Sequence, residues 1–463
     1  MSIDYLDGER LKPQMQAFAD QLMHKLQVET QESWKGTELS YWLCDLDDYM
    51  PALHWLERAE AFGSIVAHQV ALFKPEQHLP LHRGHVYFWR CDEYINGLGQ
   101  LVDWNIERDR LSEALSNAVC TLLHWFRDSG EYYSIYYPQL KLYLPIAYSQ
   151  GGATLEALWN VLPVIDVSMP ELAEKVRRAV LHSLDFWCNS EYFVNYGLFA
   201  NKDGAMLKKV TFLPDQGRDG YFAHANRCIY HAPKTIRECA GLLRKMCHAL
   251  RKSPHAKIMK DNSSMAFAFL KAAESYPERY GSTIKKWLIK MNEICCQGLT
   301  PMYWHPLHGA SRPMLRTSFT HINVLIYYYW WIHQDSTMID MAIQIAESIL
   351  ERLKMPNGLL AEQPEIAETY FDSLTDVCVS FCELYEATGD SRWYQEALGL
   401  ARNARKYHGT DKGHVLSVDG QGNIVNPTVS PRFNFLHVKS QMAIENAGNI
   451  QRNRELFDLL EDR

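Results

Sequence analysis

The sequence predicts a mainly α-helical fold, an (α/α) toroid of six to seven helical hairpins with short β-hairpin insertions. Apolar residues recur at helical spacing along most of the 463 residues. The helices alternate between one that is apolar nearly all round and one with a charged face. These pairs recur at roughly 40 to 60 residues, a period typical of arrays of helical hairpins. Buried first helices favour a closed ring, and an open solenoid is the alternative.

The clearest pair lies at 368–408. Its first helix carries apolar side chains at helical spacing: Leu374, Val377, Cys378, Phe381, Cys382 and Tyr385. Gly389 stands where a helix C′ residue belongs, and Asp390 or Ser391 then caps the second helix. The second helix has a single apolar stripe, so we expect it to lie outside the first.

Six further segments show the same alternation: 47–73, 92–126, 151–187, 262–296, 320–353 and 432–463. In the first of these we place the turn at Gly63–Ser64. The whole chain, 1–463, is therefore predicted as a single (α/α) toroid domain. Two segments with hairpin patterns interrupt the repeat, a β-rich insertion near 190–235 that covers one mouth of the ring and a short hairpin near 412–427.

Composition and charge exclude several classes of partner. The net charge is −8 and no long basic run is present, so nucleic acid is not expected as a partner. The most apolar stretch, 322–332, is too short to span a bilayer, so no membrane association is expected. The N-terminal residues are polar and acidic and show no signal peptide, which predicts a cytoplasmic protein. A homo-oligomer is left open.

The sequence also lacks the common motifs of cofactor and metal sites. The 11 cysteines are scattered without a CxxC pair, which indicates buried thiols in a reducing compartment and no zinc site. Phosphate-binding loops, dinucleotide fingerprints, HExxH and Gly-x-Ser-x-Gly are absent. We therefore expect no cofactor and no metal, and a small molecule or an oligosaccharide as the partner.

Acidic residues stand at the starts of several predicted inner helices. Asp45, Asp47 and Asp48 precede the first, and Asp92 and Glu93 begin the second. In a toroid these helix starts converge on one central funnel. A single acidic residue in a first turn more often caps the helix and complements its dipole. Three aspartates within four positions cannot all cap one helix, so we expect one of them to cap it and at least one other to serve another purpose.

Paired carboxyl groups suit the cleavage of glycosidic bonds, because one must hold a proton while the other activates water or attacks the sugar. Crowded like charges raise the pKa of one carboxyl group and so supply the acid. We predict Asp47 or Asp48 as the acid and Asp372 or His321 as the base.

The densest polar cluster lies at 302–323. Arginine binds carboxylates in bidentate fashion and histidine transfers protons near neutral pH, which suits a uronic acid held by Arg316. The alternative is a surface loop with solvated arginines and packed histidines. His305 and His308 could instead bind a metal, but they lack the helical i, i+4 spacing. The predicted substrate-binding residues are Arg316, Arg312, His305, His308, Trp304, Tyr192, Tyr196, Glu368, Tyr370, Asp92, Glu93 and Arg432.

The helical hairpins and the turn "LYEATGDSRWYQEA" (384–397) resemble the six-hairpin toroid superfamily of carbohydrate-active proteins. That superfamily includes glycoside hydrolases, polysaccharide lyases and sugar epimerases. The short segment Thr320-His321-Ile322-Asn323 is similar to a segment of D-glucuronyl C5-epimerases. The resemblance implies a carbohydrate-active enzyme with its site in the central cleft.

Three hypotheses of function follow. The first is an enzyme that acts by acid/base chemistry (hydrolysis, β-elimination or epimerisation) on an acidic sugar or oligosaccharide. The second is a class II-type terpene cyclase, because "DLDD" (45–48) matches the Asp-x-Asp-Asp acid of those enzymes; it requires a dry aromatic pocket. The third is a non-enzymatic binding or scaffold toroid, in which the acidic residues only cap helices.

Overall fold

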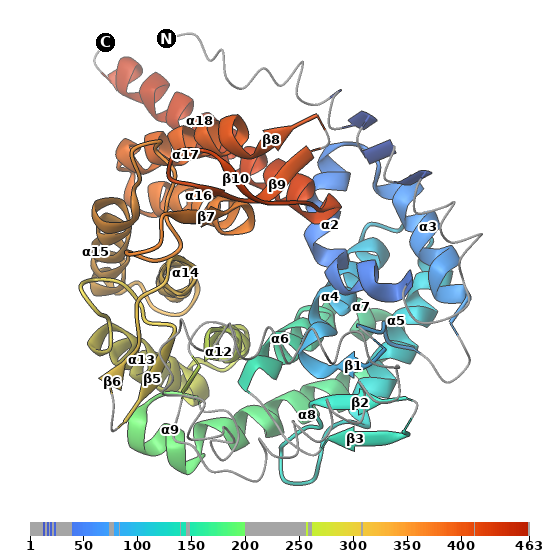
Figure 1. The fold of residues 1–463 in the computed structure, drawn as a ribbon. Helices are drawn as coiled ribbons and strands as arrows, with labels where there is room; N and C mark the ends of the chain where they lie inside the picture. Colours follow the sequence, from blue (N-terminus) through green and yellow to red (C-terminus); the bar gives the residue numbers. More distant parts are fainter. Residues whose placement is uncertain are drawn as a thin grey trace.

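The structure is a computed structural model, and it confirms the predicted toroid of helices with small sheets (Figure 1). It describes residues 39–73, 78–82, 84–138, 140–144, 149–199, 256–257, 262–306, 309–411 and 413–461, with single positions between 13 and 24. Within these residues no helix is both long and apolar enough to cross a membrane.

The inner layer of helices forms a closed ring. In the described part of the chain its members are α2 (Leu46–Trp55), α4 (Asp92–Asp103), α6 (Gly152–Asn160), α12 (Ser263–Ser275), α14 (Leu315–Trp331), α16 (Phe371–Thr388) and α18 (Pro431–Glu461). Each helix contacts the next in this order, and α18 contacts both α16 and α2. The last helix of the ring therefore packs against the first, which is the closed arrangement that the buried first helices predicted.

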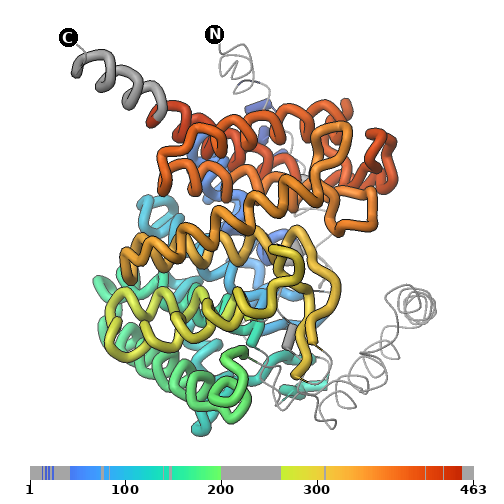
Figure 2. The backbone as a smooth tube through the Cα atoms, turned by 90° about the vertical axis from the view of Figure 1, so that its left-hand side faces the viewer, coloured from blue at the N-terminus to red at the C-terminus, as the bar shows by residue number. Residues whose placement is uncertain are grey.

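The outer layer covers this ring. It consists of α3 (Ala59–Ala71), α5 (Arg108–Leu123), α8 (Pro170–Cys188), α13 (Pro277–Glu293), α15 (Ser336–Leu353) and α17 (Ser391–His408). The side view shows α15, α13 and α8 one above another across the wall of the molecule (Figure 2). Shorter helices complete the fold: η1 (Leu39–Asp45), η2 (Phe88–Arg90), η3 (Ser149–Gly151), α7 (Leu162–Ser168) and α9 (Glu191–Tyr196).

The pair α16 and α17 shows why the two layers differ in sequence. Helix α16 packs between α14, α17 and α18, so most of its faces are buried. Helix α17 buries one stripe and leaves its charged face to solvent. Gly389 ends α16 with φ of 74°, and the Asp390 side chain accepts a hydrogen bond from the backbone N–H of Arg392 (2.9 Å) at the start of α17. The predicted boundary of this pair is confirmed.

The strands all precede inner helices. They are β1 (Val86–Tyr87), β2 (Ile135–Tyr137), β3 (Leu142–Leu144), β4 (Ala256–Lys257), β5 (Tyr303–His305), β6 (Gly309–Ala310), β7 (Glu368–Tyr370), β8 (Gly409–Thr410), β9 (Gly413–Asp419) and β10 (Ile424–Val429). They form antiparallel sheets in the orders β1-β2-β3, β4-β5-β6 and β10-β9-β7, with β8 on β9. The end of the ring where the inner helices begin therefore carries the sheets.

The two predicted hairpin segments have different outcomes. Strands β9 and β10 pair as a hairpin at the place expected for 412–427. In the 190–235 segment the described residues, up to Phe199, form helix α9 and no strand. Ser190 caps this helix and Gly197, with φ of 71°, ends it, so the β prediction is wrong for 190–199. Residues 200–235 lie outside the described part of the chain, and the prediction for them stays open.

The turn predicted at Gly63–Ser64 is also corrected. The chain turns at Leu56–Arg58, and Gly63 lies inside α3. A Cβ atom at Gly63 would lie 2.3 Å from Cγ2 of Ile106, so the glycine is needed for close packing rather than for a turn.

Gly152 should tolerate no side chain, because a Cβ there would lie 2.3 Å from Cα of Met265 in α12. We expect Gly152→Ala to lower the free energy of unfolding by about 1–3 kcal/mol or more through overpacking. Gly399→Ala, in α17, is the matched control, since a Cβ added there would meet no atom within 4 Å, and it should raise stability by roughly 0.5–1 kcal/mol. Urea unfolding of both variants tests this, and equal stabilities would contradict it.

Candidate active site

The acidic residues at the start of α2 do not cap that helix. Asp45 occupies its N-cap position without a side-chain capping bond. Its carboxylate instead accepts a hydrogen bond from Nη1 of Arg90 (3.0 Å), just before α4. The Asp48 carboxylate accepts a bond from Nε of Arg432 (2.5 Å), at the start of α18. The expectation that one aspartate of this group caps the helix is therefore wrong.

Asp47 reaches the neighbouring inner helix. Its Oδ1 accepts a hydrogen bond from Nε2 of Gln100 (2.5 Å), and its Oδ2 accepts a longer one from Nδ2 of Asn96 (3.5 Å). Both donors lie on α4, so the three aspartates together contact partners on both sides of α2.

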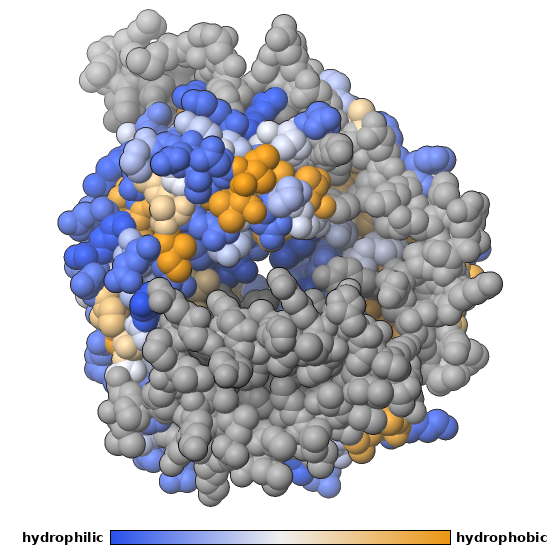
Figure 3. Space-filling view, viewed as in Figure 1, coloured by the Kyte–Doolittle hydropathy of each residue, from blue (hydrophilic) through white to orange (hydrophobic). Residues whose placement is uncertain are grey.

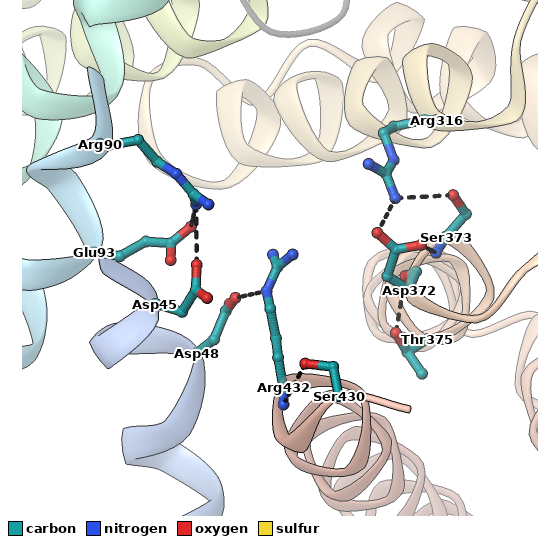
Figure 4. A network of polar contacts seen from close by, with 10 residues as sticks. All are labelled: Asp45, Asp48, Arg90, Glu93, Arg316, Asp372, Ser373, Thr375, Ser430 and Arg432. Atoms are coloured by element: carbon teal, nitrogen blue, oxygen red, sulfur yellow. Dashed lines mark hydrogen bonds and ion pairs between the residues drawn. The ribbon is translucent and has the colours of Figure 1, made fainter. Parts of the chain in front are cut away.

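A second group lies across the ring. Nη2 of Arg316, on α14, donates to Oδ2 of Asp372, at the start of α16, and to Oγ of Ser373 (3.2 Å). Figure 4 shows the side chains of Arg90, Arg432 and Arg316 pointing into one shared space, with Arg432 between the other two. We call the residues around this space the ion-pair network: Asp45, Asp48, Arg90, Glu93, Arg316, Asp372 and Arg432.

The carboxyl groups here differ in how readily they ionise. Burial raises the pKa of Asp372, but the Arg316 guanidinium outweighs burial and holds the pKa below its usual range. Burial raises the pKa of Asp47 despite the opposing charge of Lys439. Burial also raises the pKa of Asp92 to about 7. A carboxyl group with a lowered pKa and carboxyl groups with raised pKa values therefore share the interior.

More polar residues follow further along the inner helices. We call Glu156, Asp376, Glu383 and Lys439 the inner polar set. Burial raises the pKa values of its carboxyl groups, to about 8 for Glu156, about 6 for Asp376 and about 7 for Glu383. Burial opposes the charge of Lys439, but Asp48, Asp376 and other carboxylates outweigh it and raise its pKa. Figure 3 shows a hollow in the middle of this face with hydrophilic residues on its visible wall.

Several of these residues were not predicted, although some carry a sequence signal. Asp376 and Glu383 follow Asp372 by four and eleven positions, and Lys439 follows Arg432 by seven, so each shares a helix face with a predicted residue. Arg90 has no such signal, because it lies in the short helix η2 before α4.

His321 is not brought to this interior. Its side chain is 0% exposed, its Nδ1 lies 3.1 Å from Oγ1 of Thr300, and its ring packs edge-on against Trp287 of the outer helix α13. Its Nε2 has no hydrogen-bond partner among the described residues. The structure therefore gives His321 a packing environment and offers no support for its predicted role as a base.

Two predicted residues, Glu368 and Tyr370, lie on strand β7 between α15 and α16, and a third, Arg312, contacts the loop before that strand. Arg312 pairs with Glu365 at 3.3 Å, and both side chains are exposed. Glu368, on β7, accepts a hydrogen bond from Oγ of Ser417 (2.6 Å) on β9. Tyr370 is the half-buried N-cap residue of α16. The structure does not place Arg312 or Glu368 in the ion-pair network.

The predicted aromatic residues form a separate group near the outer helix α13. The rings of Tyr192 and Tyr196 lie 4.8 Å apart, and Tyr196 lies 5.7 Å from Trp304 on β5. Nζ of Lys290, on α13, lies 5.0 Å from the Trp304 ring. His305 is buried on the same strand, and His308 lies outside the described residues.

The predicted residues that the structure does bring together are Asp47, Asp48, Asp92, Glu93, Arg316, Asp372 and Arg432. In the described residues no group of three or more His, Cys, Asp or Glu side chains has the arrangement of a metal site.

No family model matches the chain, and no curated protein matches it in sequence. Solved structures match its fold. D-mannose isomerase is 11% identical with a TM-score of 0.56 and covers 85% of this chain and 97% of its own. Cellobiose 2-epimerase from Spirochaeta thermophila is 10% identical with a TM-score of 0.52 and covers 85% of this chain and 98% of its own. The α-1,2-mannosidase from Trichoderma reesei is 10% identical with a TM-score of 0.59 and covers 92% and 93%.

These likenesses show that the chain shares the fold of these solved structures, which agrees with the toroid that the sequence predicted. At such low identities the chemistry must be argued from the residues of this chain.

The buried position of His321 predicts a loss of stability in acid. Burial lowers its pKa to about 3. Below pH 6.5 this histidine therefore binds a proton in the unfolded chain but not in the folded protein. This histidine should reduce the free energy of unfolding by about 1.4 kcal/mol per pH unit between pH 6.5 and its folded pKa. Between pH 7 and pH 5 the free energy of unfolding should fall less steeply in His321→Gln than in the wild type. His54→Gln, at an exposed histidine, is the control and should leave this pH dependence unchanged. A pH dependence in His321→Gln equal to that of the wild type would contradict the prediction.

Proposed function

We propose that the protein is a carbohydrate-active enzyme that hydrolyses a glycosidic bond in the interior of the ring by acid/base chemistry. The observation that carries the proposal is the pairing of two kinds of carboxyl group in one space. Arg316 holds the pKa of Asp372 below its usual range, whereas burial raises the pKa of Asp47, so Asp47 holds a proton more readily than Asp372 does. General acid/base catalysis of glycoside cleavage requires one group of each kind.

Each of these residues has a distinct task in the proposed reaction. Asp47 donates its proton to the glycosidic oxygen as the bond from that oxygen to the anomeric carbon breaks. Asp372 either takes a proton from the attacking water or bonds to the anomeric carbon before water replaces it. Arg316 keeps Asp372 ionised and fixes its orientation with the help of Ser373, which lies 3.2 Å from the same guanidinium nitrogen.

A neutral sugar fits this interior better than the acidic sugar that the sequence suggested. The arginines expected to hold a substrate carboxylate are already paired, Arg316 with Asp372 and Arg432 with Asp48. Further carboxyl groups line the same space, so an anionic sugar would meet repulsion. We therefore propose a neutral oligosaccharide as the substrate.

The competing functions have less support. A class II-type terpene cyclase needs a dry aromatic pocket around the "DLDD" segment, whereas its aspartates face arginines and amides. A scaffold toroid needs these aspartates as helix caps, and Asp45 makes no such bond. Epimerisation is the second candidate, because a D-mannose isomerase and a cellobiose 2-epimerase share the fold.

We also propose that the protein is cytoplasmic and that it forms a homo-oligomer. All eight cysteines in the described part of the chain are free thiols, which fits a reducing compartment.

A substrate panel tests the proposed function directly. Purified protein is incubated with α-1,2-mannobiose, cellobiose, D-mannose and a uronic-acid disaccharide, and products are followed by NMR. We expect a neutral disaccharide to be cleaved and the uronic-acid disaccharide to remain intact. Conversion of D-mannose or cellobiose to an isomer without cleavage would instead favour epimerisation, and cleavage of the uronic-acid disaccharide alone would restore the acidic substrate.

Substitution of the two carboxyl groups should separate their roles. Asp372→Asn and Asp47→Asn should each reduce kcat by about 100-fold or more, since general acid/base groups contribute 10²–10⁴-fold. In the wild type, activity should fall at low pH as Asp372 is protonated, because its pKa is lowered, and fall as the pH rises and Asp47 loses its proton, because its pKa is raised. Asp340→Asn, an exposed aspartate on α15, is the control and should keep full activity. Wild-type rates in both catalytic variants would rule out this assignment.

A further inference from the structure

The interior of the ring stays accessible well below the ion-pair network. On α16 the residues Asp376, Val379 and Glu383 share the face of Asp372, and all three are partly exposed. The residues between them that point elsewhere, such as Phe381, are fully buried. Asp372 and Glu383 are eleven residues apart, which is about 16 Å along a helix. The accessible face therefore continues for three helical turns.

Other inner helices also carry polar groups. Lys439 lies two turns beyond Arg432 on α18, where its charge interacts with Asp376 and Glu383. Glu156 lies in the second turn of α6, and its charged neighbours include Lys271, Asp92 and Asp47. The carboxyl groups of Glu156, Asp376 and Glu383 make no hydrogen bond to another described residue. The inner polar set is therefore drawn from three helices and is not held together by bonds of its own.

Two buried side-chain oxygen atoms on α4 also lack a hydrogen-bond partner among the described residues. They are Oδ1 of Asp92 and Oε1 of Gln100. Gln100 donates to Asp47, so its free acceptor lies beside the proposed acid. Buried polar atoms are normally satisfied, and each exception calls for a ligand, a water molecule or another explanation.

A sugar matches these groups chemically. Each hydroxyl both donates and accepts, so it can bond to a carboxylate, to a protonated carboxyl group or to the Lys439 ammonium. An interior kept only for stability would not need three carboxyl groups and a lysine, because well-packed apolar residues are at least as stable as buried ionic groups.

We propose that Asp376, Glu383 and Lys439 form a second saccharide subsite, which holds the terminal sugar of a neutral oligosaccharide while the scissile bond lies at Asp47 and Asp372. This inference rests on the proposed function. The subsite and the network lie on the same helices, so the sugar chain enters the ring end first. Hydrolysis then releases sugars from the end of the chain and never cuts it in the middle.

Monosaccharide binding tests the subsite without any need for turnover. D-mannose and D-glucose are titrated by calorimetry into the wild type, Asp376→Asn, Glu383→Gln and the control Glu347→Gln. Glu347 pairs with Arg392 on the outer layer, so its loss should leave binding unchanged. We expect at least one of the two sugars to bind the wild type, and Asp376→Asn and Glu383→Gln each to weaken that binding at least tenfold.

Product analysis gives an independent readout. A neutral oligosaccharide labelled at its reducing end should lose single sugars in sequence, and Glu383→Gln should raise KM more than it lowers kcat. Fragments from the middle of the chain, unchanged monosaccharide affinity in both variants, or no binding of either sugar by the wild type at millimolar concentration would each overturn the subsite. If the wild type cleaves no saccharide, the proposed function fails, and the titrations still decide whether the subsite exists.

Discussion

The closure of α18 onto α2 is the constraint on which the rest of the structure depends. Arg432 and Asp48 join across it although they are 384 positions apart, and the rings of Tyr49 and Phe435 pack edge-on at 5.2 Å beside them. Because the ring is closed, the side chains on its inner faces share one narrow space. That space brings Arg432 and Lys439 opposite carboxyl groups from α2 and α16, and without it those carboxyl groups would face bulk water.

Enclosure explains why two carboxyl groups of the interior differ in pKa. Burial raises the pKa of both Asp47 and Asp372, and at Asp372 the Arg316 guanidinium outweighs this effect. Asp372 is hydrogen-bonded to Arg316, whereas the hydrogen-bond donors to Asp47 are the uncharged amides of Asn96 and Gln100. The division of roles between the two aspartates therefore follows from which neighbour each one meets, and not from any difference in the residues themselves.

Helical periodicity was enough to predict the toroid, because each inner helix needs apolar residues on nearly all faces. It also located Asp48, Asp372 and Arg432 at helix starts that converge. It could not show that Arg316 is already paired, because a pairing partner 56 positions away leaves no local pattern. His321 was misjudged since its polar neighbours in sequence hide a face that packs on Trp287. Gly63 was taken for a turn because sequence alone does not distinguish a flexible glycine from a tightly packed one.

The spread of the site from Asp45 to Lys439 has a consequence for the protein during its synthesis. The acidic residues of α2 leave the ribosome hundreds of residues before α18 can meet them. Until then they remain hydrated and charged, and the growing chain presents a row of helical hairpins with one edge uncovered. The interior forms only when α18 closes on α2, so a partly made chain has no weakened form of the site and leaves that edge uncovered.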